Sequence, residues 1–286
     1  MSDSAKSMNN KICVVTGATS GIGMETAKTL ALKGAIVIIV GRDEKKCIAT
    51  VKKLKKLSGN SLVEYICTDL SDLKQVRVLA EKLKQNHDYI DVLVNNAGAY
   101  YITRQQSVDG FEMNLALNYL SPFLLTSLLL EMLKKSEQGR IINVSSGAHI
   151  DGIIHFDDLQ LKKQFNGYRA YAHSKLAIIL FTNALARKLK ETKITVNALH
   201  PGLVATNFGK NNGLLRYYVR KFTKGRNDIS AEEGAETNIF LSTSPDVANI
   251  TGGYFINNKQ VKSSDKTYDL ELAKQLWEVS ENLVNT

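Results

Sequence analysis

A tyrosine and a lysine stand four residues apart in the run YAHSKLAII, which otherwise reads as an apolar helix. At this spacing Tyr171 and Lys175 lie one above the other on the same helical face. A free phenol loses its proton near pH ~10, and a cation held beside it favours the phenolate and lowers that value. The pair indicates a tuned acid/base, and an ordinary surface contact remains the alternative.

A glycine-rich turn, TGATSGIG, lies between the first predicted strand and the first predicted helix. Gly17, Gly21 and Gly23 permit backbone conformations barred to other residues and let a ligand approach the main chain. The N–H groups and partial positive charge at the start of the helix attract an anion. The place of the turn after a strand favours a nucleotide-phosphate site, and a purely structural turn is the alternative.

Arg42 follows the second predicted strand, where an NAD-binding protein often has an acidic residue for the ribose hydroxyls. A carboxylate would repel a 2′-phosphate, whereas Arg42 would attract it with charge-assisted hydrogen bonds. The residue therefore favours NADP(H) over NAD(H), unless it pairs with the neighbouring Asp43 or Glu44.

Apolar runs alternate with helical stretches along the chain, and a long helix is expected over 111–135. Continuous apolar strands of this kind imply a parallel sheet that is covered on both faces. The expected fold class is α/β, with a single doubly wound, Rossmann-like sheet and helices on both faces. The apolar runs are 11–17, 35–42, 63–72, 90–98, 139–146, 194–202 and 252–257.

Composition indicates a soluble globular protein with a substantial core, because 44% of the 286 residues are hydrophobic and 23% are charged. The chain has 3 prolines and no Gly/Ser/Pro-rich linker, so we expect one domain over 1–286 with a polar N-terminal extension, 1–10. This extension resembles neither a signal peptide nor a membrane anchor. The 3 cysteines lack CxxC spacing and suggest reduced thiols in the cytoplasm.

The chain carries a formal net charge of +9, which favours anionic partners such as a phosphorylated cofactor or a membrane surface. Nucleic acid is not expected, because no aromatic-rich RNA motif or DNA-reading helix accompanies the charge. No metal site is expected from the 5 histidines, and a GxSxG hydrolase motif is not present. A nucleotide-sensing protein without turnover remains a second class, although such proteins commonly lose the tyrosine or lysine.

Six motifs together resemble the short-chain dehydrogenase/reductase family over roughly residues 10–257. The strings NVSSGAH, AYAHSKLA and ALHPGLVAT are most similar to its retinol dehydrogenase-like branch, which generally prefers NADP(H). In chain order the motifs are TGATSGIG, NNAG (95–98), Asn118, NVSS (143–146), YAHSK and HPGLVAT (200–206).

The resemblance implies a catalytic tetrad of Asn118, Ser146, Tyr171 and Lys175, with Ser146 chosen because the second serine of such a pair is usually catalytic. It also implies a set of cofactor contacts. These are Gly17, Ser20, Gly21, Ile22 and Gly23 at the phosphates and ribose, Asp69 and Leu70 at the adenine, Asn95, Ala97 and Gly98 along the cofactor, and Pro201, Gly202, Val204 and Thr206 at the nicotinamide amide, joined by Tyr171 and Lys175.

The implied function is an NADP(H)-dependent oxidoreductase that interconverts an alcohol and its carbonyl compound. The cofactor carries the hydride, Tyr171 donates a proton to the carbonyl oxygen, and Ser146 donates a hydrogen bond to the same oxygen. Lys175 is expected to lower the pKa of Tyr171 and to bond the nicotinamide ribose. Oxidation of an alcohol runs along the same path in reverse.

Pro122 falls inside the predicted long helix, four residues after Asn118. Because proline has no N–H, the carbonyl of Asn118 loses its helical partner. In this family the main-chain carbonyl of the asparagine holds a water of the proton relay. We expect a kink that exposes this carbonyl towards Lys175, and a straight helix over 118–122 would contradict it.

Residues 207–230 are expected to form a substrate lid in which apolar side chains mix with basic ones, as in RYYVRKFTKGR (216–226). Such a segment suits a small hydrophobic carbonyl or alcohol substrate. Peripheral contact of 207–226 with an anionic membrane is the alternative. Many family members form dimers or tetramers through the long helix and the catalytic helix, so the resemblance also implies a homodimer or homotetramer.

Overall fold

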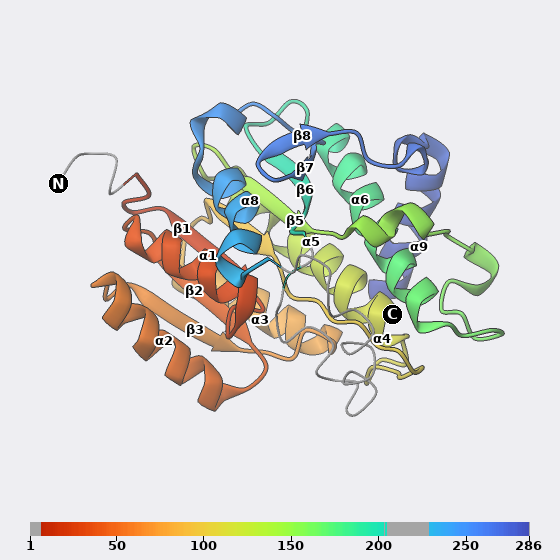
Figure 1. Ribbon diagram of the computed structural model, residues 1–286, viewed down its shortest axis with the longest axis horizontal. Helices are drawn as coiled ribbons and strands as arrows, with labels where there is room; N and C mark the ends of the chain where they lie inside the picture. Colours follow the sequence, from red (N-terminus) through yellow and green to blue (C-terminus); the bar gives the residue numbers. More distant parts are fainter. Residues whose placement is uncertain (1–6, 203, 205–228, 286) are drawn as a thin grey trace.

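A computed structural model of the chain describes residues 7–202, 204 and 229–285. Its described strands form one eight-stranded sheet in the order β3-β2-β1-β4-β5-β6-β7-β8 (Figure 1). β8 runs antiparallel to β7, and the other neighbouring pairs are parallel. The strands are β1 (Ile12–Thr16), β2 (Ile36–Gly41), β3 (Val63–Cys67), β4 (Val92–Asn95), β5 (Arg140–Val144), β6 (Thr195–His200), β7 (Tyr254–Ile256) and β8 (Lys259–Val261).

Helices cover both faces of the sheet (Figure 1). A separate hydrophobic core fills the space on each side. One face carries α1 (Gly21–Leu32), α2 (Glu44–Ser58) and α8 (Ala231–Thr243). The other carries α3 (Leu73–Asn86), α4 (Met113–Leu115), α5 (Ser121–Lys134), α6 (Gly167–Lys188) and α9 (Leu270–Asn285). Short helical turns are η3 (Gly147–Asp151), η4 (Phe156–Asp158), η6 (Pro245–Val247) and η7 (Asp265–Tyr268).

The predicted doubly wound, Rossmann-like sheet is therefore confirmed. The strand order reverses between β1 and β4, because β2 and β3 follow β1 on one side and β4 begins the other side. In such sheets ligands bind in the crevice at the carboxyl ends of the strands beside this reversal. The glycine-rich turn, 16–23, leaves β1 at that place and enters α1.

The helix α6, which carries Tyr171 and Lys175, begins four residues before Tyr171, which is earlier than the apolar run suggests. Asn166 caps it by accepting a hydrogen bond from the backbone N–H of Arg169. Gly167 permits the close approach of this first turn to the loop after β4, since a Cβ there would lie 2.5 Å from the carbonyl oxygen of Ile102. The cap thus places Tyr171 in the second turn of α6.

The stretch 111–135 is not the single regular helix that the sequence predicts. It consists of α4, a π-helix η2 (Ala116–Leu120) and α5, and Pro122 lies in the first turn of α5. Proline fits a first turn because it has no N–H to donate, and its ring disfavours a regular α-helix through the preceding residues. The wider π-turn interrupts the regular α-helical hydrogen bonding around Asn118. Such π-turns are frequent at functional sites.

The helical run Met113–Lys134 is the one candidate membrane span among the described residues, with a mean hydropathy of 1.4 over its best window. Of that window, 72% is buried inside the protein. A core helix of this composition passes the same test of length and hydropathy, so the run is weak evidence for a membrane span.

The C-terminal helix α9 covers the face formed by α5 and α6. The ring of Trp277 lies 5.2 Å from that of Phe123 and 5.7 Å from that of Phe181, between centroids. The hydroxyl groups of Tyr119 and Ser280 are 2.6 Å apart and hydrogen-bonded. A homodimer through the long helix and the catalytic helix would therefore have to include α9 or displace it.

Replacing Trp277 by alanine is expected to lower the free energy of unfolding by about 2–3 kcal/mol, because its ring joins two aromatic side chains and is half-buried. Chemical denaturation monitored by circular dichroism measures the change. Leu270→Ala, at a 58% exposed position of the same helix, serves as the control and should cost less than about 0.5 kcal/mol. Equal losses for the two variants would contradict the described packing.

Candidate active site

A cavity of about 530 Å³ opens at the carboxyl ends of β1 to β4, where the strand order reverses. Its wall contains most of the residues expected to contact the cofactor: Gly17, Ser20, Gly21, Ile22, Gly23, Arg42, Asp69, Leu70, Ala97 and Gly98. The structure thus brings together residues from four loops that lie up to 81 positions apart (98 − 17).

The glycine-rich turn has no room for a side chain at Gly17 or at Gly23. Gly17 has a φ of +66°, and a Cβ on it would lie 2.8 Å from the Cα of Ala97. A Cβ on Gly23 would lie 2.4 Å from the side-chain nitrogen of Asn96. Ser20 precedes α1 without a side-chain cap hydrogen bond in the described part of the chain, so the first N–H groups of α1 suit a phosphate.

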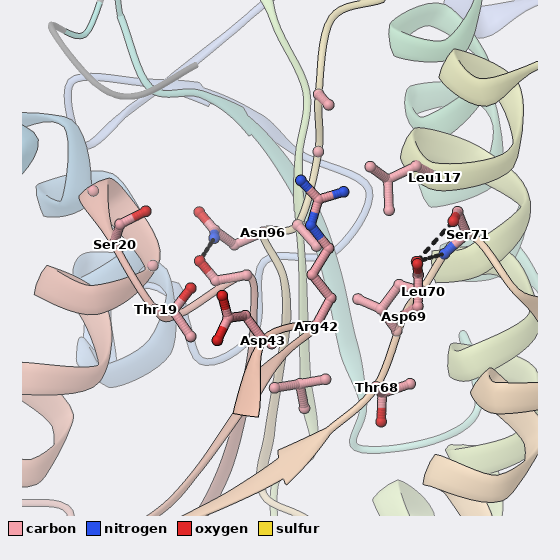
Figure 2. A pocket seen from close by; sticks show the side chains of 18 of the residues that line it. Thr19, Ser20, Arg42, Asp43, Thr68, Asp69, Leu70, Ser71, Asn96 and Leu117 are labelled. Atoms are coloured by element: carbon pink, nitrogen blue, oxygen red, sulfur yellow. Dashed lines mark hydrogen bonds between the residues drawn. The ribbon is translucent and has the colours of Figure 1, made fainter. Parts of the chain in front are cut away.

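Arg42 reaches into the cavity between Asn96 on one side and Asp69 and Ser71 on the other (Figure 2). The predicted alternative, pairing with Asp43 or Glu44, is not what the structure shows. The Asp43 carboxylate bonds the backbone N–H and the ammonium of Lys46, and Glu44 hydrogen-bonds Tyr65. Arg42 instead hydrogen-bonds the hydroxyl of Tyr101, which acts against the rise that burial causes in the pKa of Tyr101.

Asn95 does not lie in the cavity wall, although it was expected to line the cofactor. Its amide is buried beneath the site and donates to Thr126 Oγ1 and Asn143 Oδ1. The next residue, Asn96, lines the cavity and donates from its side chain to the carbonyl of Thr16 at 2.8 Å. Successive side chains of a strand point to opposite sides, so the first asparagine of NNAG supports the sheet and the second holds the glycine turn.

Asp69 and Leu70 lie in the wall, at the end of β3. Asp69 Oδ1 accepts hydrogen bonds from the backbone N–H and the hydroxyl of Ser71, at 2.9 and 2.7 Å (Figure 2). These bonds fix the carboxylate at the rim of the cavity, on the side opposite the glycine-rich turn (Figure 2).

Tyr171 and Lys175 lie together on α6, with the ammonium of Lys175 5.6 Å from the centre of the Tyr171 ring. Lys175 is buried and donates to the carbonyl of Val144 at the end of β5, at 2.9 Å. The ring of Tyr100, from the loop after β4, lies 5.3 Å from that of Tyr171. The pair is therefore part of a buried site and not a surface contact.

The expected lowering of the Tyr171 pKa is wrong for this structure. Burial raises the pKa of Tyr171 to about 12, and a hydrogen bond with Ser146 only partly opposes the rise. Burial also lowers the pKa of Lys175 to about 8. Removal from water disfavours the charged form of each group, and the ammonium is bonded to the Val144 carbonyl rather than to the phenol.

The two serines of NVSS have separate places. The hydroxyl of Ser145 is buried and donates to the backbone carbonyl of Lys175 at 2.8 Å. Ser146 bonds the hydroxyl of Tyr171 and caps η3, where its oxygen accepts the N–H of Ala148 at 3.2 Å. Ser145 thus supports the backbone of α6, whereas Ser146 hydrogen-bonds the phenol of Tyr171.

Asn118 lies in the π-helix with its side chain held by the loop after β4. Its Oδ1 accepts the N–H of Ala99 at 2.9 Å, and its Nδ2 donates to the carbonyl of Ala99 and to Ser174 Oγ. A Cβ on Gly98 would lie 3.1 Å from Asn118 Oδ1 and 3.4 Å from Lys175 Nζ. The side chains of Asn118 and Lys175 therefore meet at Gly98. The π-turn interrupts the regular α-helix at Asn118, and exposure of the Asn118 carbonyl towards Lys175 stays a prediction.

The segment after β6 supplies the last expected cofactor contacts. Gly202 has a φ of +85°, and Val204 forms an isolated bridge with Ile229. A Cβ on Gly234 of α8 would lie 2.7 Å from a methyl of Val204 and 3.2 Å from Ile22 Cγ1, so α8 joins this segment to the glycine-rich turn. Pro201 is half-buried beside Gly202, whereas Thr206 and the predicted lid through residue 228 lie outside the described residues.

These features fit a dinucleotide. The glycine-rich turn lets a ligand approach its backbone closely. The start of α1 and the guanidinium of Arg42 offer positive charge to phosphates. Asp69 and Leu70 line the opposite end of the cavity with a carboxylate and an apolar group. When bound, a nicotinamide cofactor supplies the hydride. The ammonium of Lys175 lies beside Gly98, 5.6 Å from the centre of the Tyr171 ring, and the phenol of Tyr171 hydrogen-bonds Ser146.

Comparison with known proteins agrees with this geometry. The family model described as short chain dehydrogenase matches residues 11–214. Human retinol dehydrogenase 13 is 40% identical over 279 residues, which cover 96% of this chain and 84% of the relative. Mouse retinol dehydrogenase 12 is 39% identical over 270 residues, covering 94% and 85%.

Solved structures show the same fold. A Mycobacterium paratuberculosis protein superposes with a TM-score of 0.79 at 31% identity and covers 97% of this chain and 94% of its own. A Shigella flexneri protein complexed with NADP gives a TM-score of 0.72 at 24% identity, covering 89% and 100%. With the sheet, the motif order and these matches, the chain belongs to the short-chain dehydrogenase/reductase family, in its retinol dehydrogenase-like branch.

Proposed function

We propose that this protein, acting as a single domain, is an NADP(H)-dependent oxidoreductase that interconverts a small hydrophobic alcohol and its carbonyl compound. The observation that carries the proposal is the meeting of Tyr171, Ser146 and Lys175 beside a cavity that fits a dinucleotide. Family membership supports oxidoreduction at a CH–OH group with a nicotinamide cofactor.

Tyr171 acts as the acid in reduction and gives its phenolic proton to the substrate oxygen as negative charge grows there. The hydroxyl of Ser146 donates a hydrogen bond to the same oxygen and stabilises that charge. The raised pKa of Tyr171 keeps the phenol protonated before the reaction, which suits an acid. Lys175, bonded to Val144, holds a positive charge near the ring and favours the phenolate that remains.

The residues that would hold the cofactor form groups, one for each part of the cofactor that they would contact. Charge complementarity supports placing the 2′-phosphate at Arg42, with Lys46 also in the cavity wall. The remaining assignments are Gly17, Ser20, Gly21, Ile22 and Gly23 to the phosphates and ribose, Asp69 and Leu70 to the adenine, Asn96, Ala97 and Gly98 to the central part, and Pro201, Gly202, Val204 and Thr206 to the nicotinamide amide.

The substrate is proposed to be hydrophobic because an aromatic ring, Tyr100, faces Tyr171 where the carbonyl must approach. The relatives are named for retinol, so retinol and retinal are suitable first probes. A panel of aldehydes, ketones and alcohols with both cofactor pairs, followed by absorbance, tests the assignment. Turnover of none of them would support a nucleotide-sensing role instead.

We place the enzyme in the cytoplasm. Contact of residues 207–226 with an anionic membrane is the alternative, and liposome pelleting tests it.

Arg42→Glu is expected to weaken NADPH binding by about 10–100-fold and to change NADH binding little, because it removes charge-assisted hydrogen bonds to the 2′-phosphate and adds repulsion. Fluorescence titration with each cofactor measures both affinities. Lys45→Glu makes a similar change of charge at an exposed neighbour outside the cavity wall and is the control. Equal weakening for both cofactors would contradict the proposed preference.

A further inference from the structure

His149 joins the loop of Ser146 to a distant part of the chain. The histidine lies in η3 and is 2% exposed. Its Nδ1 is 2.8 Å from the carbonyl oxygen of Ser146, and its Nε2 accepts the backbone N–H of Ser264 at 3.1 Å. Ser264 lies 115 residues later, between β8 and η7. One ring therefore bridges the reacting serine and the segment that follows the last strand of the sheet.

The two partners determine where the imidazole proton lies. A backbone N–H only donates, so Nε2 must accept from Ser264, and a carbonyl only accepts, so Nδ1 must carry the hydrogen. The neutral Nδ1–H tautomer satisfies both contacts. Protonation of the ring would set a second N–H against the N–H of Ser264 and break the bridge.

The carbonyl of Ser146 receives a second hydrogen bond from the backbone N–H of His149, at 3.1 Å. The same residue thus holds this carbonyl from its main chain and its side chain. The hydroxyl of Ser146 extends from the held backbone to Tyr171 and to the N–H of Ala148. A rotation of the Ser146 backbone would move the hydroxyl away from the phenol.

We propose that neutral His149 is a positioning residue that holds the Ser146 hydroxyl in register with Tyr171, and that protonation of His149 releases it at acidic pH. This inference rests on the proposed role of Ser146 in the reaction. Among the described residues, His149 is not part of the cavity wall, and its ring bonds the main-chain carbonyl of Ser146; its effect therefore passes through the Ser146 backbone.

The groups around His149 oppose its protonation. Burial lowers its pKa, the bond to Ser146 acts in the opposite direction, and the ammonium of Lys266 adds a further lowering. Lys266 comes from η7 and donates to the carbonyls of Ile150 and Gly152. The ring of Tyr254, from β7, lies 5.0 Å from that of His149, and its hydroxyl is 3.5 Å from Nδ1, where the oxygen can accept from the same N–H. His200, from β6, also faces His149.

The sign of the pH effect follows from this surrounding. Because the folded protein disfavours protonated His149, its contribution to stability is complete above the ordinary histidine pKa of about 6.5 and is lost as pH falls below it. In the folded protein the bridge to Ser264 breaks as pH falls through the lowered pKa of His149, which lies below the ordinary value. We therefore expect kcat to fall on the acid side, below about pH 6.5.

The test compares His149→Phe, which removes both ring contacts, with His149→Gln, which keeps one donor and one acceptor. His149→Phe should lower kcat about 10–100-fold, while KM and the Kd for NADPH change less than about threefold. His149→Gln should recover part of kcat and lose the acid-side fall. His155→Phe, at an exposed position six residues later, is the control and should retain the wild-type pH profile.

The bridge is also tested from its other end. Ser264 has a φ of −63°, which proline shares, so Ser264→Pro removes the donor without changing the backbone angle. Its kcat should fall like that of His149→Phe, and the double variant should be no worse than either single one. Ser264→Ala keeps the N–H and should behave as wild type. Circular dichroism and thermal unfolding establish that each variant is folded.

The outcomes separate this inference from the proposed function. If Ser146→Ala keeps full turnover, the role of Ser146 fails. If Ser146→Ala is inactive while Ser264→Pro and a folded His149 variant keep wild-type kcat and its acid-side profile, the positioning role of His149 is overturned. A loss in His155→Phe equal to that in His149→Phe would overturn it as well. Should His149→Phe not fold, Ser264→Pro and His149→Gln decide the result.

Discussion

Replacing Tyr171 by phenylalanine should lower kcat by about 10²–10⁴-fold, because the phenol is the proposed proton donor and its hydroxyl meets Ser146. Phenylalanine keeps the ring, so its contact with Tyr100 and the packing of α6 should persist. Binding of NADPH should consequently change little. Stopped-flow or steady-state absorbance with a substrate from the carbonyl panel measures kcat, and fluorescence titration measures the cofactor affinity.

Tyr168→Phe provides the matched control for this experiment. Tyr168 lies three residues earlier on α6, is 46% exposed, and bonds Asp151 through its hydroxyl. Its loss of a hydroxyl should leave kcat within about threefold of wild type. Similar losses in both variants would mean that removal of any phenol from this helix disturbs the site. Full activity of Tyr171→Phe would refute the acid/base role.

Gly17→Ala is expected to lower the free energy of unfolding by about 2–4 kcal/mol. The loss has two parts: the cost of a left-handed backbone conformation for alanine, and the steric overlap of its Cβ with a neighbouring residue. The φ of +66° accounts for the first part. The second arises because the new Cβ would lie 2.8 Å from the backbone of Ala97, which adjoins Gly17 in the cavity wall. The wall must shift, so NADPH should also bind at least about tenfold more weakly.

Gly59→Ala separates the two costs. Gly59 has nearly the same φ, +65°, and a Cβ on it meets nothing within 4 Å among the described residues. This variant should lose only the backbone part, about 1–2 kcal/mol, and should bind NADPH normally. Chemical denaturation gives the stabilities and fluorescence titration gives the affinities. Equal stabilities for the two variants would show that the turn has more room than the structure indicates.

The sequence was sufficient for the seven parallel strands and for most of the cofactor cavity, since both depend on local signals, whereas the short antiparallel strand β8 was not predicted. Apolar runs identify buried parallel strands, and a glycine turn after the first strand identifies the start of α1. Predictions of this kind need no knowledge of how distant residues pack.

Features that depend on packing were missed. Asn95 and Asn96 are adjacent and chemically identical, and only the direction of each side chain at the end of β4 separates their roles. A spacing of four indicates that Tyr171 and Lys175 are neighbours, but it gives no measure of burial, which controls both pKa values. The partner of His149 in the segment after β8 carries no sequence signal either.

The helix α9 was also outside the predicted pattern, although its apolar residues Leu272, Leu276 and Leu283 recur at helical spacing. Its position on α5 and α6 has a consequence for synthesis. Trp277 follows Phe181 by 277 − 181 = 96 residues, so at roughly 5–20 residues per second a ribosome needs on the order of 5–20 s between them. During that interval Phe123 and Phe181 lack their contact with Trp277. We expect chaperones to bind this exposed apolar surface of the nascent chain.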